Sequence, residues 1–322
     1  MTSDDRPPSA APTEDVLPEA LTRAAALLRC PVCGADGVVA TARRARVGGL
    51  TCPAAHHWDA ARAGVVNLLT GAGTRFTPDS AAMVEARDRF LGAGHYAPIA
   101  GAVAQAVTEA VTEAKPGGTA VLDAGAGTGY YLDAVLSALT GGGSGRGTAA
   151  DPVAVATDLS PAALRRLARA VPTALPLVWD TWRPLPLTDA AVDVVLAVFA
   201  PRNILEFARV LAPQGVLVLV TPRPGHLEEL RTLTGMLAVE PDKEERLHHA
   251  LAGRFTVAGE RDVDVPLELS TADAADAAFM GPAGHHASPE DLAERLAGVD
   301  TPIRVTARVT VHTLRPQAHD AD

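Results

Sequence analysis

The stretch VLDAGAGTGYY, at residues 121–131, decides the fold of this chain. A short apolar run ends at Asp123 and is followed by Gly125, Gly127 and Gly129, which predicts a buried strand, a glycine-rich turn and the start of a helix. Glycines at such a turn let a nucleotide-like ligand approach the backbone closely. The third glycine comes one position too early for the G-x-G-x-x-G pattern of dinucleotide-binding proteins, so the spacing disfavours that class.

The segments around this turn alternate between short apolar runs and amphipathic runs. Such alternation predicts an α/β protein with a doubly wound sheet. The predicted strands are residues 119–125, 153–160, 175–181, 192–200 and 215–222, and the predicted helices are residues 130–139, 161–171 and 203–211. Alternating β-branched segments at 253–269 and 301–314 predict antiparallel strands at the edge of this sheet.

Acidic side chains lie at the ends of the first three predicted strands. Asp158 is suited to bind two ribose hydroxyls, and Asp180 to bind an adenine amino group. Each acid also has a plainer interpretation: Asp123 as a partner of a helix dipole, Asp158 as a helix N-cap before Ser160, and Asp180 as a turn residue. Together with the glycine turn, the three acids resemble the cofactor site of class I S-adenosylmethionine (AdoMet) methyltransferases.

All three cysteines of the chain fall in one pattern with a histidine. Cys30, Cys33, Cys52 and His56 form C-x2-C-x18-C-x3-H, two close pairs of ligands that suit one tetrahedral Zn²⁺. Four protein ligands leave no open coordination position, so the predicted site is structural. His57 is a rival fourth ligand ranked below His56, and the alternative for the cysteines is three unrelated buried side chains.

The sequence divides into four predicted regions. They are a disordered leader at 1–21, a zinc-binding module at 22–72, a helical linker region at 73–116 and an AdoMet-dependent methyltransferase domain at 117–322. The predicted fold class is therefore α/β: a class I AdoMet-dependent methyltransferase (Rossmann-like) domain with a small N-terminal zinc-ribbon module. The leader lacks the apolar stretch of a signal peptide.

The N-terminal regions have predicted elements of their own. Residues 22–29 predict a short helix, and residues 38–52 predict the β-hairpin of a zinc ribbon. A loop is expected at 71–80. The predicted linker helices are residues 81–94, capped by Asp79 or Ser80, and residues 95–114.

Charge and composition limit the partners of the chain. Its net charge is −10, which argues against nucleic acid, but residues 22–100 contain nine arginines, five acids and no lysine, a local charge of +4. Arginine suits phosphate and base contacts, although a solvated arginine face is the plainer interpretation. No apolar run reaches the ~20 residues of a membrane span. A thiolate zinc site fits a reducing compartment, so we expect a cytoplasmic protein without membrane contacts.

A zinc module joined to an AdoMet domain resembles the large-subunit ribosomal RNA guanine-N1 methyltransferases, including the macrolide-resistance (tylosin-type) members. The strings that carry the resemblance are CPVC, CPAAHHWD, AGVVNLL, DSAAMVEARDRFLGAGHY, LDAGAGTGYY, FAPRN, TPRPGHLEEL, KEERL and FMGP. The resemblance implies methylation of guanine N1 in a domain II hairpin loop of 23S rRNA, which can hinder macrolide binding. It also allows a homodimer.

The resemblance implies further cofactor contacts. Tyr96 and His226 would contact AdoMet, and Gly127 and Thr128 would touch its methionine part. Without the resemblance, Tyr96 would be interpreted as a half-buried helix residue and His226 as a loop histidine.

The target base is expected at residues 199–203, where Phe199 would stack on the guanine and Asn203 would bind its edge. The plainer interpretation of this segment is a turn that caps the next helix with Asn203. Guanine N1 must lose its proton, and Asp180, His226, Asn203 and Glu206 are the candidate catalytic groups. Water or the RNA could accept the proton instead, with much of the rate coming from alignment.

The chain departs from the family at one place, because His285 or His286 follows FMGP where related sequences often carry tryptophan. Two rival functions remain. A small-molecule AdoMet-dependent methyltransferase would share the whole AdoMet domain, and a non-enzymatic zinc-ribbon RNA-binding adaptor would keep it as a relic. The arginine-rich module argues against the first, and the intact glycine turn and Asp158 argue against the second.

Overall fold

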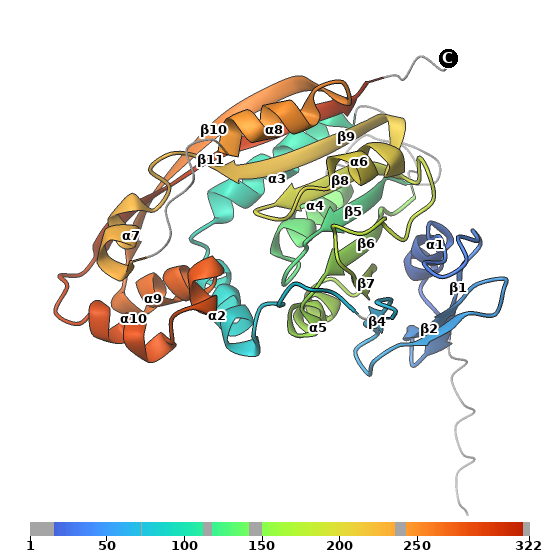
Figure 1. Cartoon of the computed structure of the whole chain (residues 1–322), viewed down its shortest axis with the longest axis horizontal. Helices are drawn as coiled ribbons and strands as arrows, with labels where there is room; N and C mark the ends of the chain where they lie inside the picture. The colour runs from blue at the N-terminus through green and yellow to red at the C-terminus, as the bar shows by residue number, and fades with distance from the viewer. Residues whose placement is uncertain (1–15, 72, 112–117, 142–149, 236–242, 318–322) are drawn as a thin grey trace, which may run out of the picture.

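The computed structural model describes residues 16–71, 73–111, 118–141, 150–235 and 243–317 (Figure 1). Most of the predicted leader and most of the glycine-rich stretch after residue 140 lie outside the described residues. None of the described helices is both long and apolar enough to cross a membrane.

An eight-stranded sheet forms the centre of the molecule, in the order β10-β11-β9-β8-β5-β6-β7-β4. Its strands are β4 (Val66–Asn67), β5 (Ala120–Ala124), β6 (Val153–Asp158), β7 (Ala174–Val178), β8 (Val192–Val198), β9 (Leu211–Pro222), β10 (Phe255–Leu269) and β11 (Ile303–Pro316). Strands β4 to β9 pair in parallel, whereas β11 is antiparallel to both β9 and β10. The predicted α/β sheet with an antiparallel edge is thus confirmed. Strand β9 begins at Leu211, before the predicted Gly215, because Leu211 already pairs with Val192.

Helices cover both faces of this sheet. The first face carries α3 (Ala97–Ala110), α4 (Tyr130–Gly141) and α5 (Pro161–Ala170), and the second carries α1 (Glu19–Ala26), α6 (Ile204–Val210) and α8 (Lys243–Leu251). Neighbouring residues of β5 point to opposite faces, so Val121 joins the first core and Leu122 joins the second. A strand buried on both faces explains why its sequence is continuously apolar.

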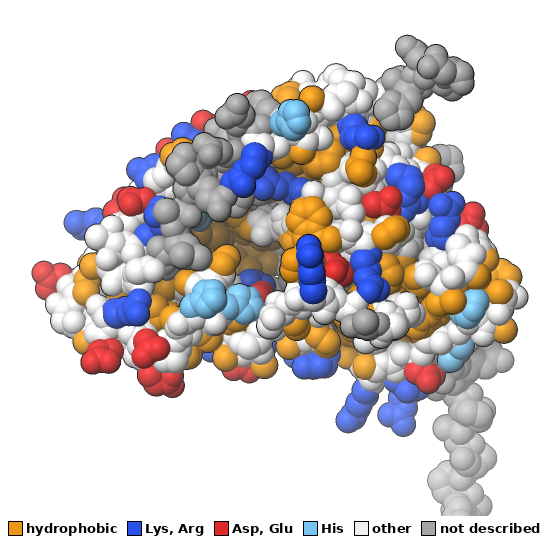
Figure 2. All heavy atoms as spheres, in the orientation of Figure 1, with side chains coloured by type: hydrophobic (Ala, Val, Ile, Leu, Met, Phe, Trp, Pro, Cys, Tyr) orange, Lys and Arg blue, Asp and Glu red, His pale blue; other side chains and the backbone are white. Residues whose placement is uncertain are grey.

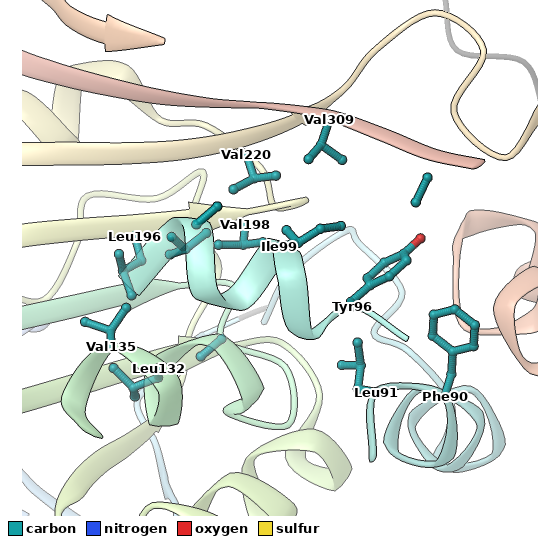
Figure 3. Close-up of a cluster of buried hydrophobic side chains, with 14 of the residues drawn as sticks. Phe90, Leu91, Tyr96, Ile99, Leu132, Val135, Leu196, Val198, Val220 and Val309 are labelled. Carbon is teal, nitrogen blue, oxygen red and sulfur yellow. The ribbon is translucent and has the colours of Figure 1, made fainter. Parts of the chain in front are cut away.

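Tyr96 lies at the edge of the first core, where α3 begins (Figure 3). Ile99 of α3 packs with Val198 of β8 and Val220 of β9 in that core. The Tyr96 side chain lies between Ile99 and Phe90, and its hydroxyl points away from Phe90. The helix that the sequence predicted as part of a linker region is therefore packed against the central sheet.

A second, smaller sheet lies near the N-terminus. It is antiparallel and consists of β1 (Val39–Arg43), β2 (Arg46–Thr51) and β3 (His57–Asp59). The predicted hairpin is confirmed as β1 and β2, which turn through Arg44 and Ala45 with positive φ angles of 52° and 57°. The sequence did not predict β3.

The N-terminal module shares the second core with the large sheet. Leu28 and Leu50 are buried in that core together with Leu187, which follows β7. Strand β4, from the predicted zinc-binding module, extends the large sheet beside β7. Helix α1 begins at Glu19, so the predicted leader is wrong for residues 19–21. The reason is that Leu21 is buried in this core. The other domain boundaries stay predictions.

The remaining helices form a lobe that lies opposite the carboxyl ends of β8 and β9 (Figure 1). They are α2 (Ala81–Gly92), α7 (Glu228–Thr234), α9 (Thr271–Phe279), the 3-10 helix η1 (Pro282–His285) and α10 (Pro289–Arg295). Ser80 is the N-cap of α2 and accepts a hydrogen bond from the Met83 amide, which settles the choice between Asp79 and Ser80. Figure 2 shows a hollow between this lobe and the sheet, with hydrophobic side chains inside it and Lys or Arg side chains along its border.

Candidate active site and metal centre

The glycine turn after β5 lies at the carboxyl end of the central strand. Gly125, Gly127 and Gly129 all have positive φ angles, of 87°, 54° and 87°. A Cβ at Gly125 would lie 2.5 Å from the Ala200 Cβ, and one at Gly129 would lie 2.9 Å from the Leu167 Cγ. At Gly127 the nearest atom, a guanidinium nitrogen, is 3.7 Å away. Two glycines are therefore required by packing, while Gly127 leaves one side of the turn open to a ligand.

Asp158, at the end of β6, is tied to this turn. The Gly127 amide donates to its Oδ2 at 2.9 Å, and the Ser160 amide donates to its Oδ1 at 2.7 Å. Burial raises the Asp158 pKa, and these two hydrogen bonds oppose that shift. Ser160 rather than Asp158 is the N-cap of α5. Each carboxylate oxygen keeps a lone pair, so the group can accept hydrogen bonds from two hydroxyls.

Asp123 is a buried carboxyl one strand away. It lies within β5, only 2% exposed, and it therefore does not act at a helix terminus. Burial and the nearby charge of Asp158 raise its pKa to about 8. A positively charged ligand beside the turn would favour its ionised form, so this site fits a cationic group such as the sulfonium or ammonium of AdoMet.

Tyr96 and His226 lie side by side. The Tyr96 hydroxyl lies 3.5 Å from His226 Nε2, although 130 positions separate the two residues. Tyr96 is 2% exposed, so its interpretation as a half-buried residue was wrong, and burial is the cause of its raised pKa. Burial lowers the His226 pKa to about 4, which keeps the imidazole neutral near pH 7. Its Nδ1 faces the Arg308 backbone, 2.9 Å from the carbonyl oxygen and 3.1 Å from the amide nitrogen.

Phe199 lies beside this pair, directly after β8. Its ring centroid is 6.1 Å from that of Tyr96, 6.0 Å from that of His226 and 6.3 Å from that of Tyr131. Phe199 is 41% exposed and has a φ of 53°, a left-handed backbone that costs a non-glycine residue on the order of 1–3 kcal/mol. Strained, exposed aromatic residues are candidates for a binding role. The sequence analysis missed Tyr131, whose only signal was its position just after the glycine turn.

Asp180 is buried at the end of β7. Its Oδ1 accepts a hydrogen bond from the Trp182 amide at 3.0 Å, and its Oδ2 accepts one from the Thr74 hydroxyl at 2.6 Å. Thr74 belongs to the predicted loop at 71–80, which thus reaches the carboxyl end of the sheet. Thr128, in the glycine turn, is also buried.

Asn203 and Glu206 are engaged within the protein. Asn203 caps α6 by accepting a hydrogen bond from the Glu206 amide, and its Nδ2 donates to the Thr181 carbonyl at 3.0 Å. The plainer interpretation of this segment is therefore confirmed. Glu206 forms an ion pair with Arg209 at 2.6 Å. Neither side chain is hydrogen-bonded to the Tyr96–His226 pair in the part of the chain that the structure describes.

Arg87 of α2 reaches the glycine turn from the lobe, and the sequence analysis missed it. Its Nη1 would lie 3.7 Å from a Cβ placed at Gly127. Its Nη2 lies 2.6 Å from Asp79 Oδ2 and donates to the Met280 carbonyl at 2.5 Å. His285 lies 3.5 Å from the other oxygen of Asp79, so the position that departs from the family contacts this same group.

The four predicted metal ligands converge. The ligand atoms of Cys30, Cys33, Cys52 and His56 all lie within 4.8 Å of one another. The His56 Nδ1 is 3.3 Å from the Cys52 Sγ and 3.6 Å from the Cys30 Sγ, and the Cys33 and Cys52 sulfurs are 3.9 Å apart. Tetrahedral Zn²⁺ with bonds near 2.0–2.3 Å places its ligand atoms about 3.6–3.8 Å apart, so the donor set fits that ion.

His57 is held away from this cluster. Its Nδ1 lies 2.8 Å from the Thr51 hydroxyl, and its Nε2 lies 3.1 Å from Asp59 Oδ1. These contacts occupy both ring nitrogens across β2 and β3. The geometry thus favours His56 over His57 as the fourth ligand.

Known proteins place the chain in a family, although no family model matches it. It is 44% identical over 299 residues to a protein of Micromonospora griseorubida named as a 23S rRNA (guanine-N(1)-)-methyltransferase, covering 90% of this chain and 97% of that protein. It is 38% identical over 289 residues to the 23S rRNA (guanine(748)-N(1))-methyltransferase of Streptomyces fradiae, covering 90% and 96%. YxjB of Bacillus subtilis (strain 168), named likewise, is 33% identical over 71% of this chain and 75% of its own length.

These relatives agree with the architecture. The parallel strand order, with a glycine turn after the central strand, is that of a class I AdoMet-dependent methyltransferase. Two of the relatives align along nine-tenths of the chain and nearly all of their own length. This chain belongs to the family of 23S rRNA (guanine-N1)-methyltransferases.

Proposed function

We propose that this protein transfers a methyl group from AdoMet to N1 of a guanine in a domain II hairpin loop of 23S rRNA. The observation that carries the proposal is the 44% identity to a named guanine-N1 methyltransferase across 90% of the chain. The relationship to the Streptomyces fradiae enzyme supports a role in tylosin-type macrolide resistance. We infer that the protein works in the cytoplasm, where its rRNA substrate would be found.

The cofactor would lie across the carboxyl ends of β5, β6 and β7. Bound AdoMet supplies an electrophilic methyl group on a sulfonium. The open side of Gly127, with Thr128, would receive the methionine part, and Asp158 would bind the ribose hydroxyls. Asp180 would face the adenine amino group through the lone pairs that its two hydrogen bonds leave free.

Five further residues complete the proposed cofactor site. The carboxyl of Asp123 would face the positive charge of the cofactor, and Gly125 and Gly129 would hold the turn in shape. Tyr96 and His226, which lie 3.5 Å apart at their polar atoms, would close the site from the side of the substrate.

The target guanine would enter the hollow beside Phe199. An unstacked base from a hairpin loop is the cheapest to bring into such a site, and an exposed aromatic ring offers it a stacking surface. The φ of Phe199 presents that ring at the end of β8 instead of burying it. Because the Asn203 amide is engaged in capping α6, we assign Asn203 to holding this turn.

Loss of the N1 proton needs an acceptor or a well-aligned attack. His226 is neutral near pH 7, but a pKa of about 4 makes it a weak base. We therefore assign His226 to positioning Tyr96 and the reactants, and we assign most of the rate to alignment of N1 with the methyl group.

The zinc module would hold the RNA. Zn²⁺ at Cys30, Cys33, Cys52 and His56 would have a structural role because four protein ligands complete its coordination. The hairpin of β1 and β2 carries three exposed arginines at or beside its turn, which are Arg43, Arg44 and Arg46. Exposed guanidinium groups on a projecting hairpin suit contacts with RNA phosphates.

The test is to incubate purified protein with tritiated AdoMet and unmodified 23S rRNA and to map the label by primer extension. A stop at one guanine in the domain II hairpin supports the proposal, because N1 methylation blocks base pairing. AdoMet binding without labelled RNA would favour a small-molecule substrate, and no AdoMet binding would favour an RNA-binding adaptor. The homodimer stays a prediction, which light scattering of the same sample tests.

A further inference from the structure

Arg202 is a partly buried cation, and one nitrogen of its guanidinium lacks an acceptor among the described residues. It lies in the turn between β8 and α6, shortly after Phe199. Its Nη1 is buried and has no hydrogen-bond partner in the described part of the chain. Burial is the main cause of its lowered pKa. A buried donor on a charged group is unfavourable unless something binds it, so this side chain is a candidate for a ligand contact.

A neighbouring arginine shows the contrast. Arg209, on α6, uses all five of its N–H groups in hydrogen bonds with Glu206, Asp189 and the carbonyls of Leu185 and Leu187. That side chain joins α6 to the segment after β7 and therefore has a structural role. Arg202, at the other end of the same helix, makes no such connection among the described residues.

A second cation lies near Arg202. Arg246 is exposed on α8, and its positive charge is the other cause that lowers the Arg202 pKa. Helices α6 and α8 cover the same face of the sheet, where Ile204 and Leu247 join one core. The positive charge of Arg246 is therefore felt at Arg202.

We propose that Arg202 binds a backbone phosphate adjacent to the target guanine and so positions the nucleotide whose base stacks on Phe199. This inference rests on the proposed function. Every base of an RNA chain is flanked by phosphates, and the planar guanidinium fork matches their oxygens. The carboxylate of AdoMet is the other anion at hand. The proposed cofactor site, however, is at the turn after β5, where Arg87 already reaches the glycines.

The first test compares Arg202→Gln with the wild type in three measurements: affinity for a synthetic RNA hairpin from 23S domain II, affinity for AdoMet, and melting temperature. We expect RNA affinity to fall roughly 10- to 100-fold, as for loss of a charge-assisted hydrogen bond. The slope of log affinity against log salt should fall by about one. AdoMet affinity should not change. The melting temperature should not fall, because the buried Nη1 of Arg202 has no acceptor to lose in the part of the chain that the structure describes.

The matched control is Arg304→Gln, which removes an exposed arginine paired with Glu268 on the antiparallel edge of the sheet. It should leave all three measurements unchanged. The second test replaces single phosphates of the hairpin by uncharged methylphosphonates, one at a time. At one position beside the target guanosine, the methylphosphonate should weaken RNA binding by the wild type as much as the Arg202→Gln substitution does. The same methylphosphonate should not weaken RNA binding by the Arg202→Gln variant any further.

Several outcomes would overturn the inference. One is that Arg202→Gln binds the RNA as tightly as the wild type. Another is that each methylphosphonate weakens RNA binding by the variant as much as it weakens binding by the wild type. The others are that the variant binds AdoMet more weakly or melts at a lower temperature. The last two would assign Arg202 to the cofactor or to the fold. Failure of the wild type to methylate the hairpin would refute the proposed function itself, which this design separates from failure at Arg202.

Discussion

The buried carboxyl of Asp123 should couple AdoMet binding to pH. Burial and the charge of Asp158 raise its pKa from 3.8 to about 8, so the carboxyl is mostly protonated at pH 7 in the free protein. A sulfonium and an ammonium brought to the adjacent turn favour the ionised carboxylate. Binding of AdoMet should therefore release a proton from Asp123.

The size of the effect follows from the pKa. With a pKa of about 8, roughly one-tenth of the Asp123 carboxyls are ionised at pH 7, so binding that needs the carboxylate is weakened about tenfold, or by about 1.4 kcal/mol. Affinity should then rise about tenfold per pH unit below pH 8 and level off above it. His226, with a pKa of about 4, does not titrate in this range.

Calorimetric titration of the protein with AdoMet, in buffers with different ionisation enthalpies, counts the protons released. We expect nearly one proton per AdoMet at pH 7 and almost none at pH 9.5. The variant Asp123→Asn should release none and should show a flat affinity between pH 6 and 9. A wild type whose affinity is already flat over that range would refute the reasoning, because the carboxyl would then be ionised before binding.

The same carboxyl should affect stability. Its pKa is raised in the folded protein, so the stability that its protonated form contributes is fully present below about pH 3.8. That stability is lost progressively as the pH rises from there and is gone above about pH 8. The loss is at most about 1.4 kcal/mol per pH unit. Urea unfolding of wild type and Asp123→Asn without cofactor should therefore diverge in favour of the variant as the pH rises. Parallel curves would contradict the raised pKa.

Three further predictions concern the metal, the turn and the stacking surface. Cys52→Ala should lose zinc and lower the melting temperature, and zinc retained at one equivalent with full stability would sink the metal assignment. Gly127→Asp should abolish AdoMet binding. The added Cβ meets no atom closer than 3.7 Å, so the expected cost to the fold is the backbone strain at a φ of 54°, on the order of 1–3 kcal/mol, and a melting curve checks that the variant is folded. Unchanged calorimetric affinity would exclude the proposed pocket. Phe199→Gly should relieve a left-handed backbone strain on the order of 1–3 kcal/mol and so raise the melting temperature. It should also lower kcat/KM for RNA, because the stacking ring is lost. A variant as active as the wild type would show that Phe199 is not part of the substrate site.

Local sequence pattern determined much of this protein. The alternation of apolar and amphipathic runs predicted β5 to β9 and the helices between them, because the repeat of buried positions is a property of each segment alone. The C-x2-C-x18-C-x3-H spacing predicted the ligand cluster around Cys52, since short loops bring the members of each pair together in almost any fold. The glycine turn at 125–129 was equally local, because φ angles near 87° at Gly125 and Gly129 require glycine.

Tertiary structure decided what depends on distant segments. Sequence periodicity states which side chains are buried but not which ones meet, so no pattern placed the Tyr96 hydroxyl 3.5 Å from His226. Strand β4 joined the large sheet for the same reason, because pairing with β7 is a long-range contact.

Titration and unmet hydrogen bonds also belong to the folded state. The raised pKa of Asp123 comes from burial and from the charge of Asp158. Both causes depend on segments that are distant from Asp123 in the sequence. The unpartnered nitrogen of Arg202 could be recognised only after every described neighbour had its place. The sequence alone thus determined the elements and the ligand sets. Only the tertiary structure decided which groups meet and what charge they carry, because both depend on contacts between residues far apart along the chain.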